Sequence, residues 1–497
     1  TGTIALSSAS VSLTSGDASN RTIFESTLTT TNSTTEGAVA FTLDIEDLAG
    51  NTATVNATTD GSSVIFDRTT PLMSYARMTS SGSDTNFAKV SDVITLSMKA
   101  NDKLKAAPVV TVFTNAATVS GSNADSLWTA TYTLPDALAD GEVPFTLDFT
   151  DMAGNTGTRL TSTVNDPGLD VVYDEIPPDL DLVDIYSNNT NNDTLAKVGN
   201  QITLRVESSE PIKAPTISIA ARSGDGAATL VNSADDLTAY TSNYTMLTGD
   251  TEGKVAFSVD YVDRAGNVGT QVTHLTDDGA DADNFNDLTT DSDNKLVTFD
   301  KTPPYFNETT AQGAGVISIS SNNDDNTLAK LGDVITLSLT STEQIKTGSD
   351  PTVTINGNNA TVSRAADNKT FTATYTMSST DGSSNISSIP FSISSYEDLA
   401  GNEGATVTNS TTDGTSVKYD PVRPTLSNIV MVSNNDNNAY AKLADEIELT
   451  FESSETINTP VVTMNSSSDG ITVASTAANE WKATRTVING DTEDEVA

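Results

Sequence analysis

A five-residue motif, Asp-x-Ala-Gly-Asn, occurs four times and carries the most specific chemistry in this chain. Its acidic and amide residues form the pairs Asp47 and Asn51, Asp151 and Asn155, Asp263 and Asn267, and Asp398 and Asn402. Asp and Asn side chains accept hydrogen bonds from the backbone of their own turn, and glycine adopts the positive φ that such turns need. The same side chains offer the carboxylate and amide oxygens that calcium prefers. The motif therefore predicts a tight turn that is either purely structural or a binding site for Ca²⁺.

Another acidic residue follows each motif, in an aromatic-Asp pair with proline a few residues later. These aspartates are Asp67, Asp174, Asp300 and Asp420. Because proline cannot join the middle of a β-ladder, the segment marks a short, stiff junction between domains. We expect the motif turn to lie where the chain leaves the domain, with the Asn- and Asp-rich loops at 187–193, 321–326 and 433–438 adding oxygens from the next domain. This convergence favours Ca²⁺ between successive domains over a plain turn.

Two other charged positions recur in each repeat. An acidic residue follows one predicted strand, at Asp102, Glu210, Glu343 and Glu455. We interpret it as a solvated loop edge, because carboxylates are rarely buried. A lysine precedes the same strand, at Lys89, Lys197, Lys330 and Lys442. It is expected to offset nearby carboxylates at the surface.

The residue patterns of common enzymes are missing. His274 is the only histidine, so a Ser-His-Asp triad could form in one repeat at most. The chain contains no H-E-x-x-H, no G-x-S-x-G and no phosphate-binding glycine loop. A glycosidase needs one special pair of carboxylates, whereas these carboxylates recur in every copy. The sequence therefore predicts a protein that is not an enzyme.

Charge and composition exclude several partners. The chain has 67 acidic and 25 basic residues, a formal net charge of −42, which repels nucleic acid and anionic membranes and attracts cations. Solubility in saline water is the other explanation for such a surface. No apolar run is long enough to span a bilayer, so we expect no direct membrane insertion of this segment. There is no cysteine, and bound metal could replace the disulfides of small secreted domains.

The elements that must position these residues are β-strands. Apolar residues make up 36% and aromatic residues 6% of the chain, which predicts thin cores between two sheets packed face to face. A strand with period-two alternation precedes each motif, and in the fourth copy one extra residue predicts a β-bulge near Ser394 and Ser395. Each copy also has one aromatic residue expected to anchor its core, namely Phe24, Trp128, Tyr240, Phe371 and Trp481.

The repeats predict an all-β chain of tandem immunoglobulin-like β-sandwich domains in an elongated array. The expected domains are a partial repeat at 1–70, full repeats at 71–176, 177–302 and 303–423, and a partial repeat at 424–497. A cut sandwich exposes strand edges, which natural proteins avoid. We therefore expect the chain to be an excerpt of a longer array, or its terminal domains to be completed by strand exchange between neighbouring chains.

The repeats resemble the immunoglobulin-like domains of giant bacterial and archaeal surface proteins. The resemblance rests on the combined pattern SNN, LAK, ITL, SSE, ATYTM, DLAGN and TPP, and covers essentially the whole chain. Relatives of this type include calcium-stiffened adhesin stalks and surface layers, among them those of marine archaea. The resemblance implies that the motif Asp, the motif Asn and the linker Asp bind Ca²⁺. This chain departs from the pattern at Asn200, where other copies have Asp, and in an acidic insertion at 277–293.

Two functions fit these expectations. The first is a structural extracellular protein, a segment of a surface-layer or sheath-like lattice of like chains with a cation-attracting acidic surface. The alternative is the stalk of a large calcium-dependent adhesin or biofilm protein. Divergence among the copies favours the lattice, because lateral contacts make each domain's surface different. Both predict an extracellular, cell-surface location, and sequons such as Asn56, Asn243 and Asn409 are compatible with attached glycans.

Overall fold

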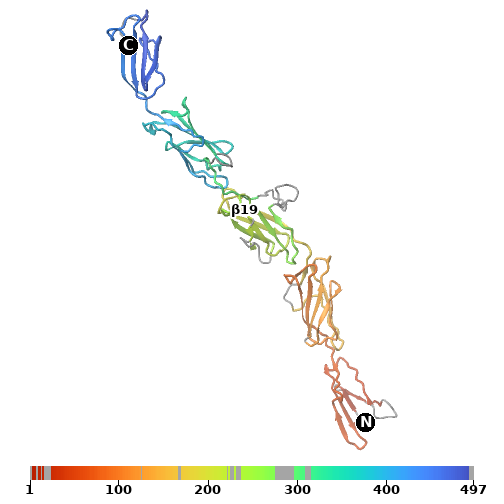
Figure 1. The fold of residues 1–497 in the computed structure, drawn as a ribbon. Helices are drawn as coiled ribbons and strands as arrows, with labels where there is room; N and C mark the ends of the chain where they lie inside the picture. Colours follow the sequence, from red (N-terminus) through yellow and green to blue (C-terminus); the bar gives the residue numbers. More distant parts are fainter. Residues whose placement is uncertain are drawn as a thin grey trace. The chain divides into compact units, whose positions relative to one another are not determined.

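The computed structural model describes residues 3–6, 9–12, 14–15, 24–124, 126–165, 170–220, 222–223, 229–230, 237–274, 296–307 and 315–491. Across these residues the chain is built of β-strands, with one 3-10 turn, η1 (Ser379–Asp381). It divides into two compact units, Thr1–Phe299 and Asp300–Ala497. Figure 1 shows the strands coloured along the sequence. The predicted all-β class is confirmed. None of the described helical segments has the length and apolarity needed to cross a membrane. The acidic insertion at 277–293 lies outside the described residues.

The first unit contains the partial first repeat and the second and third repeats. The strands of the first repeat are β1 (Thr3–Leu6), β2 (Ala9–Ser12), β3 (Thr14–Ser15), β4 (Phe24–Glu25), β5 (Gly37–Ala38), β6 (Phe41–Glu46), β7 (Thr52–Val55) and β8 (Ile65–Phe66). Those of the second are β9 (Met73–Ser80), β10 (Phe87–Ala88), β11 (Val93–Ala100), β12 (Val109–Val112), β13 (Asn115–Ala116), β14 (Thr118–Ser122), β15 (Leu127–Thr133), β16 (Gly141–Glu142), β17 (Phe145–Asp148) and β18 (Val172–Tyr173). Those of the third are β19 (Leu180–Ser187), β20 (Leu195–Ala196), β21 (Gln201–Ser208), β22 (Thr216–Ile219), β23 (Arg222–Ser223), β24 (Thr229–Leu230), β25 (Ala239–Thr245), β26 (Gly253–Lys254), β27 (Phe257–Asp260), β28 (Val272–Thr273) and β29 (Thr298–Phe299).

The second unit contains the fourth repeat and the partial fifth repeat. The strands of the fourth are β30 (Val316–Ser321), β31 (Leu328–Ala329), β32 (Val334–Thr340), β33 (Thr352–Ile355), β34 (Asn358–Asn359), β35 (Thr361–Arg364), β36 (Thr370–Thr376), β37 (Phe391–Ser394), β38 (Val407–Thr408) and β39 (Lys418–Tyr419). Those of the fifth are β40 (Leu426–Ser433), β41 (Glu446–Ser453), β42 (Ile471–Ala477) and β43 (Glu480–Thr486).

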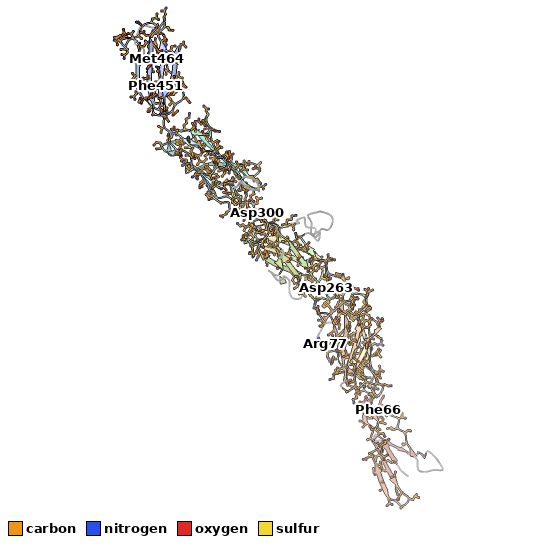
Figure 2. All side chains as sticks on the ribbon, viewed as in Figure 1. Phe66, Arg77, Asp263, Asp300, Phe451 and Met464 are labelled. Carbon is orange, nitrogen blue, oxygen red and sulfur yellow. The ribbon has the colours of Figure 1, made fainter. Side chains whose placement is uncertain are left out.

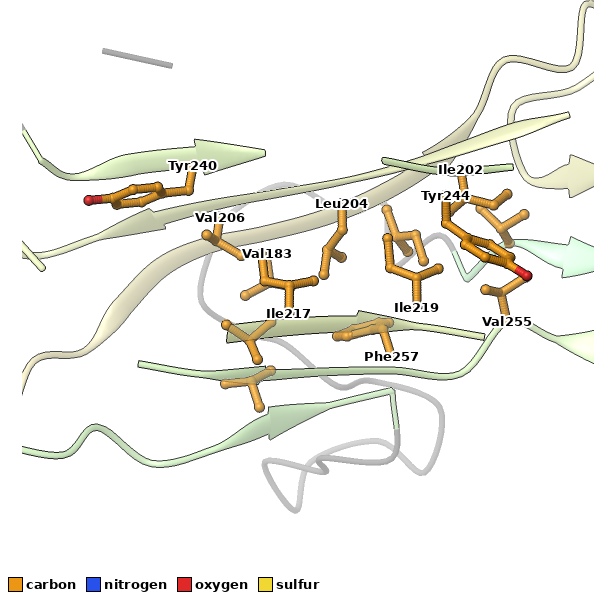
Figure 3. Packing of buried hydrophobic residues seen from close by; sticks show 14 of the residues in the cluster. Val183, Ile202, Leu204, Val206, Ile217, Ile219, Tyr240, Tyr244, Val255 and Phe257 are labelled. Atoms are coloured by element: carbon orange, nitrogen blue, oxygen red, sulfur yellow. The ribbon is translucent and has the colours of Figure 1, made fainter. Parts of the chain in front are cut away.

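Each of the second, third and fourth repeats is a sandwich of two antiparallel sheets. In the third repeat the strand orders are β19-β21-β25-β24 and β23-β22-β27-β28. Alternate residues of β21, namely Ile202, Leu204 and Val206, are fully buried. Figure 3 shows them facing Ile217 and Phe257 of the opposite sheet. The core therefore lies between the sheets, as the period-two alternation predicts.

The second and fourth repeats have the same plan. Their sheets are ordered β14-β15-β11-β9 with β13-β12-β17, and β30-β32-β36-β35 with β34-β33-β37-β38. The predicted aromatic anchors Trp128, Tyr240 and Phe371 are buried, and Trp481 is half-buried. The side chain of Phe24 lies outside the described residues. These anchors fill the space between the sheets, which confirms the expectation for the three complete repeats.

A short parallel ladder joins the beginning and the end of each complete repeat. Strand β10 pairs in parallel with β18, β20 with β29, and β31 with β39. In the second repeat the backbone N–H of Asp174 extends this ladder by donating to the carbonyl oxygen of Ala88 at 2.9 Å. The last residues before each linker are therefore bonded to a segment that lies early in the same repeat.

In the three complete repeats an aromatic residue two positions before the motif packs on a glycine six positions after the motif aspartate. A Cβ added to Gly269 would lie 2.2 Å from the ring of Tyr261, so no larger residue fits without movement. Gly157 with Phe149 and Gly404 with Tyr396 repeat this packing. The first repeat has Ile45 and Ala53 at the two positions. In the fourth repeat the extra residue is Ser395, which follows β37 with φ 58° and leaves Tyr396 buried.

Candidate metal centre

The motif forms a closed turn whose aspartate is held by backbone N–H groups. In the third repeat the N–H of Asp263 donates to the carbonyl oxygen of Asn267 at 3.1 Å. Oδ1 of Asp263 accepts from the N–H of Asn267 at 2.9 Å and from that of Gly266, whose φ is 97°. Asp263 is 0% exposed. The turn therefore fixes a carboxylate inside the protein, and Figure 2 labels this residue.

Two other motif aspartates are equally buried. Asp151 is 0% and Asp398 is 1% exposed, and each accepts from the N–H of its motif asparagine, at 2.8 Å and 2.9 Å. Asp47 makes the same bond at 2.8 Å but is exposed. An ionised carboxylate out of contact with water needs hydrogen bonds and an opposite charge. The turn supplies only the hydrogen bonds.

The motif asparagine ties the turn to the linker. Nδ2 of Asn267 donates to Oδ2 of Asp263 at 2.7 Å and to the carbonyl oxygen of Asp174 at 2.9 Å. The same two bonds join Asn155 to Asp151 and Asp67, and Asn402 to Asp398 and Asp300. This side chain therefore positions both the motif carboxylate and the linker backbone.

The motifs of the second, third and fourth repeats meet the aspartate of the linker before their repeat, which differs from the sequence expectation. The motif turn had been expected at the end of the domain from which the chain leaves. It reverses the chain, however, because Leu160 after the motif pairs antiparallel with Leu147 before it. The chain then runs back along the sandwich and leaves through β18. The motif therefore lies where the chain comes in, beside Asp67 in the case of Asp151.

A third carboxylate completes each group, from the loop that the sequence analysis interprets as solvated; Asp102 is exposed there, whereas Glu210 and Glu343 are half-buried. The groups are Asp67, Asp102 and Asp151; Asp174, Glu210 and Asp263; and Asp300, Glu343 and Asp398. In each group carboxylate oxygens of the three residues lie within 4.8 Å of one another. The third acid arrives because a buried residue two positions later, such as Ile212, forms a β-bridge with the motif aspartate. The bridge joins residues that are far apart in the sequence, so no local pattern identifies the third acid.

Burial, neighbouring charges and hydrogen bonds shift the pKa values of three of these acids. Burial and the neighbouring carboxylates of Asp174 and Asp263 raise the pKa of Glu210 to about 7. Burial and the charge of Asp263 also raise the pKa of Asp174. For Asp151 burial acts in the same direction, but hydrogen bonds from Asn155 and Gly154 outweigh it and lower the pKa. The negative charges of Asp174, Asp263 and Asp140 all raise the pKa of Glu210, and such a group of carboxylates favours the binding of a cation.

The first and fifth repeats each contain part of this group. In the first repeat Asp47 and Asn51 form the turn at the surface. In the fifth repeat Asp420 lies beside Glu455, and burial together with the Asp420 charge raises the pKa of Glu455. Neither Asp47 nor Asp420 belongs to a cluster of three carboxylates among the described residues.

The Asn- and Asp-rich loops use their oxygens within the loop. Oδ1 of Asn323 accepts from the N–H of Asp325 at 3.3 Å, and Oδ1 of Asp325 accepts from the N–H of Thr327 at 3.0 Å. The amide of Asn323 donates to Asp333 at 2.8 Å. These bonds form Asx-turns within the loop. That the loops add ligands for a cation stays a prediction.

Comparisons with known proteins return low-scoring matches among solved structures. No family model and no curated protein matches the chain. Among solved structures, the I67–I69 fragment of the titin I-band is 8% identical with a TM-score of 0.29, and the match covers 72% of this chain and 100% of the fragment. The titin I9–I11 tandem is 8% identical with a TM-score of 0.25, and the match covers 68% of this chain and 96% of the tandem. A chain from the complex of Dpr2 Ig1–Ig2 with DIP-Theta Ig1–Ig3 is 11% identical with a TM-score of 0.20, and the match covers 71% of this chain and 100% of that chain.

Proposed function

We propose that this chain is a structural protein of the cell surface whose immunoglobulin-like repeats are stiffened by Ca²⁺ at their linkers. The observation that carries this proposal is the recurrence of a buried motif aspartate with two further carboxylates at the start of each complete repeat. A feature that recurs in this way serves the array rather than one active site. The residues supply oxygen ligands only, which suits a hard cation.

Calcium fits these groups better than magnesium does. Calcium accepts six to eight oxygens in flexible geometry, whereas magnesium requires a near-ideal octahedron and loses its water reluctantly. Asp174, Glu210 and Asp263 come from three separate segments, a linker, a loop and a turn. A cation held here would join the linker aspartate to the repeat that follows it. The bond from Asn267 to the carbonyl oxygen of Asp174 already brings the two together.

Binding can be tested by calorimetric titration of the whole chain with calcium. A triple variant, Asp102→Asn, Glu210→Gln and Glu343→Gln, removes one charge from each group without a large change of shape. A matched triple variant, Glu142→Gln, Glu252→Gln and Glu403→Gln, changes three exposed carboxylates. We expect tight binding in the wild type and in the matched control, with loss in the first variant. Equal binding by all three proteins would contradict the proposal.

The stiffened array could serve as a surface-layer or sheath-like lattice or as an adhesin stalk. The stalk is favoured by the fact that each carboxylate group draws its residues from one chain, so calcium there would not join separate chains. The lattice needs additional contacts between copies. Negative-stain microscopy with calcium, and with sodium chloride at matched ionic strength, separates the two functions. Ordered sheets or tubes that need calcium would support the lattice, and separate rods at high protein concentration would support the stalk.

A further inference from the structure

The joint between the second and third repeats contains an arginine that the motifs of the other repeats lack. The second residue of the motif is arginine in the third repeat, Arg264, whereas the other copies have Leu48, Met152 and Leu399. Met152 and Leu48 are exposed. Arg264 instead reaches back to the second repeat, within the same compact unit. This position thus distinguishes one joint from the others.

Arg264 makes two kinds of contact with the second repeat. Its Nε and Nη2 both donate to Oδ2 of Asp84, at 2.9 Å and 2.7 Å. Its guanidinium carbon lies 4.2 Å from the centroid of the Phe87 ring. The side chains of Arg264 and Asp84 are 31% and 24% exposed, so the pair is partly removed from water. A planar guanidinium can pair and stack in this way, whereas leucine and methionine can do neither.

Asp84 is already oriented for this pair by its own loop. Its Oδ1 accepts from the N–H of Asn86 at 3.2 Å, which leaves Oδ2 for the arginine. Asn192, Asp325 and Asn437 form the same Asx-turn in the loops of the later repeats. The loop therefore does not depend on the charge of Asp84, because asparagine fills the position in two of them.

Two lysines cross the same joint in opposite directions. Nζ of Lys213, in the third repeat, donates to Oγ of Ser83 in the second at 2.8 Å. Nζ of Lys89, in the second repeat, donates to the carbonyl oxygen of Gly266 in the third. Lys89 had been expected to offset carboxylates at the surface, and the structure gives it this contact between repeats instead. Lysine and arginine are scarce in this chain, 25 of 497 residues, yet three of them meet at one joint.

We propose that Arg264, Lys89 and Lys213 form a clamp that keeps the joint between the second and third repeats ordered without any bound cation. The clamp shares no residue with the carboxylate group at Asp174, Glu210 and Asp263. Replacing Arg264 or removing the charge of Asp84 therefore leaves all three carboxylates of that group in place. This joint stays closed when cations are removed. The motifs of the second and fourth repeats lack the arginine.

The absence of cysteine allows a direct test on the whole chain. Spin labels on Thr118→Cys and Thr216→Cys, both exposed in the wild type, report the distance across this joint. Labels on Thr52→Cys and Thr118→Cys report the joint between the first and second repeats. Double electron–electron resonance is recorded with calcium and with a calcium chelator. In chelator we expect a narrow distance distribution across the clamped joint and a broad one across the reference joint.

Two variants remove the clamp while leaving the fold of each repeat in place. Arg264→Met introduces the residue of the second repeat, and Asp84→Asn introduces the residue of the third and fifth repeats. In chelator, both should broaden the clamped joint to the width of the reference joint. Recovery of a narrow distribution in calcium would show that the variant is folded and that the carboxylate group works independently. A wild-type joint that broadens in chelator, or variants that stay narrow there, would overturn the clamp while leaving calcium binding untouched.

Discussion

The substitution Glu210→Gln should stabilise the third repeat in chelator and destabilise it, relative to the wild type, in calcium. In chelator the ionised Glu210 lies beside Asp174 and Asp263, whose negative charges oppose its ionisation. Its pKa of about 7, against an ordinary value of 4.5, means that folding is penalised once the group ionises. The penalty is absent below about pH 4.5, grows between the two values and is complete above about pH 7. Glutamine removes it, because glutamine carries no charge at any of these pH values.

The expected size follows from the same shift. A pKa unit corresponds to about 1.4 kcal/mol, so the difference amounts to about 3 kcal/mol, and solvent screening of the partly exposed carboxyl reduces it to about 2 kcal/mol. At pH 8 in chelator, Glu210→Gln should therefore stabilise the third repeat by about 2 kcal/mol. With calcium at about 100 times the dissociation constant, the wild type gains about 2.7 kcal/mol, and the variant should gain less because it has lost a charged ligand.

Hydrogen exchange followed by mass spectrometry measures the stability of each repeat separately within the whole chain. In chelator, amides of β21 and β25 should become roughly 30-fold more protected in the variant, the factor that corresponds to about 2 kcal/mol. Peptides of the second repeat provide an internal reference, and Glu142→Gln, an exposed carboxylate on β16, should leave protection unchanged. Lower protection of the variant in chelator, or an undiminished response to calcium, would refute the assignment of Glu210 to a cation site.

Three further outcomes are expected. In chelator, Asp151→Ala should destabilise the second repeat by about 2–4 kcal/mol, because it removes a buried, hydrogen-bonded carboxylate. Asp47→Ala, which removes an exposed carboxylate, should destabilise the first repeat by less than about 1 kcal/mol. Equal losses of exchange protection in the two variants would contradict this expectation. Gly269→Ala places a Cβ 2.2 Å from the Tyr261 ring and should cost about 1–3 kcal/mol, read as a lower melting temperature of the third repeat, and an unchanged value would refute the close packing. Proteolysis after Asp300 should accelerate in chelator and slow with calcium but not with magnesium; digestion that ignores calcium would count against a bound cation there.

Much of the fold was predictable because β-sandwich repeats express their cores as period-two alternation. That alternation correctly places the strand before each motif and aromatic anchors such as Tyr240. It also places the residue inserted before Tyr396. Positions that repeat in register reinforce one another, since the same side of each strand must face the same core. The motif turn was also predictable, because Asp-x-Ala-Gly-Asn has its own local hydrogen bonds.

The composition of the carboxylate groups was less predictable, because it depends on pairing between distant segments. Sequence order suggested that Asp174 would join Asp151, whereas reversal of the chain at the motif joins it to Asp263. Glu210 looked like a loop residue because nothing next to it in the sequence shows that Ile212 forms a bridge with the motif aspartate. Arg264 was equally hidden, since its partner Asp84 lies in another repeat. Local patterns report turns and strands, and only tertiary structure reports which turns meet.

The parallel ladder between β10 and β18 has a consequence for how a repeat bears tension. Pulling on the two linkers of the second repeat draws its early strands one way and β18 the other, along the direction of these strands. The hydrogen bonds of Ala88 with Asp174 and of Asn86 with Val172, both 2.9 Å long, are then loaded together in shear rather than opened one after another. The ladders of β20 with β29 and β31 with β39 place the third and fourth repeats under the same geometry. Each complete repeat thus resists extension first at the residues next to its outgoing linker.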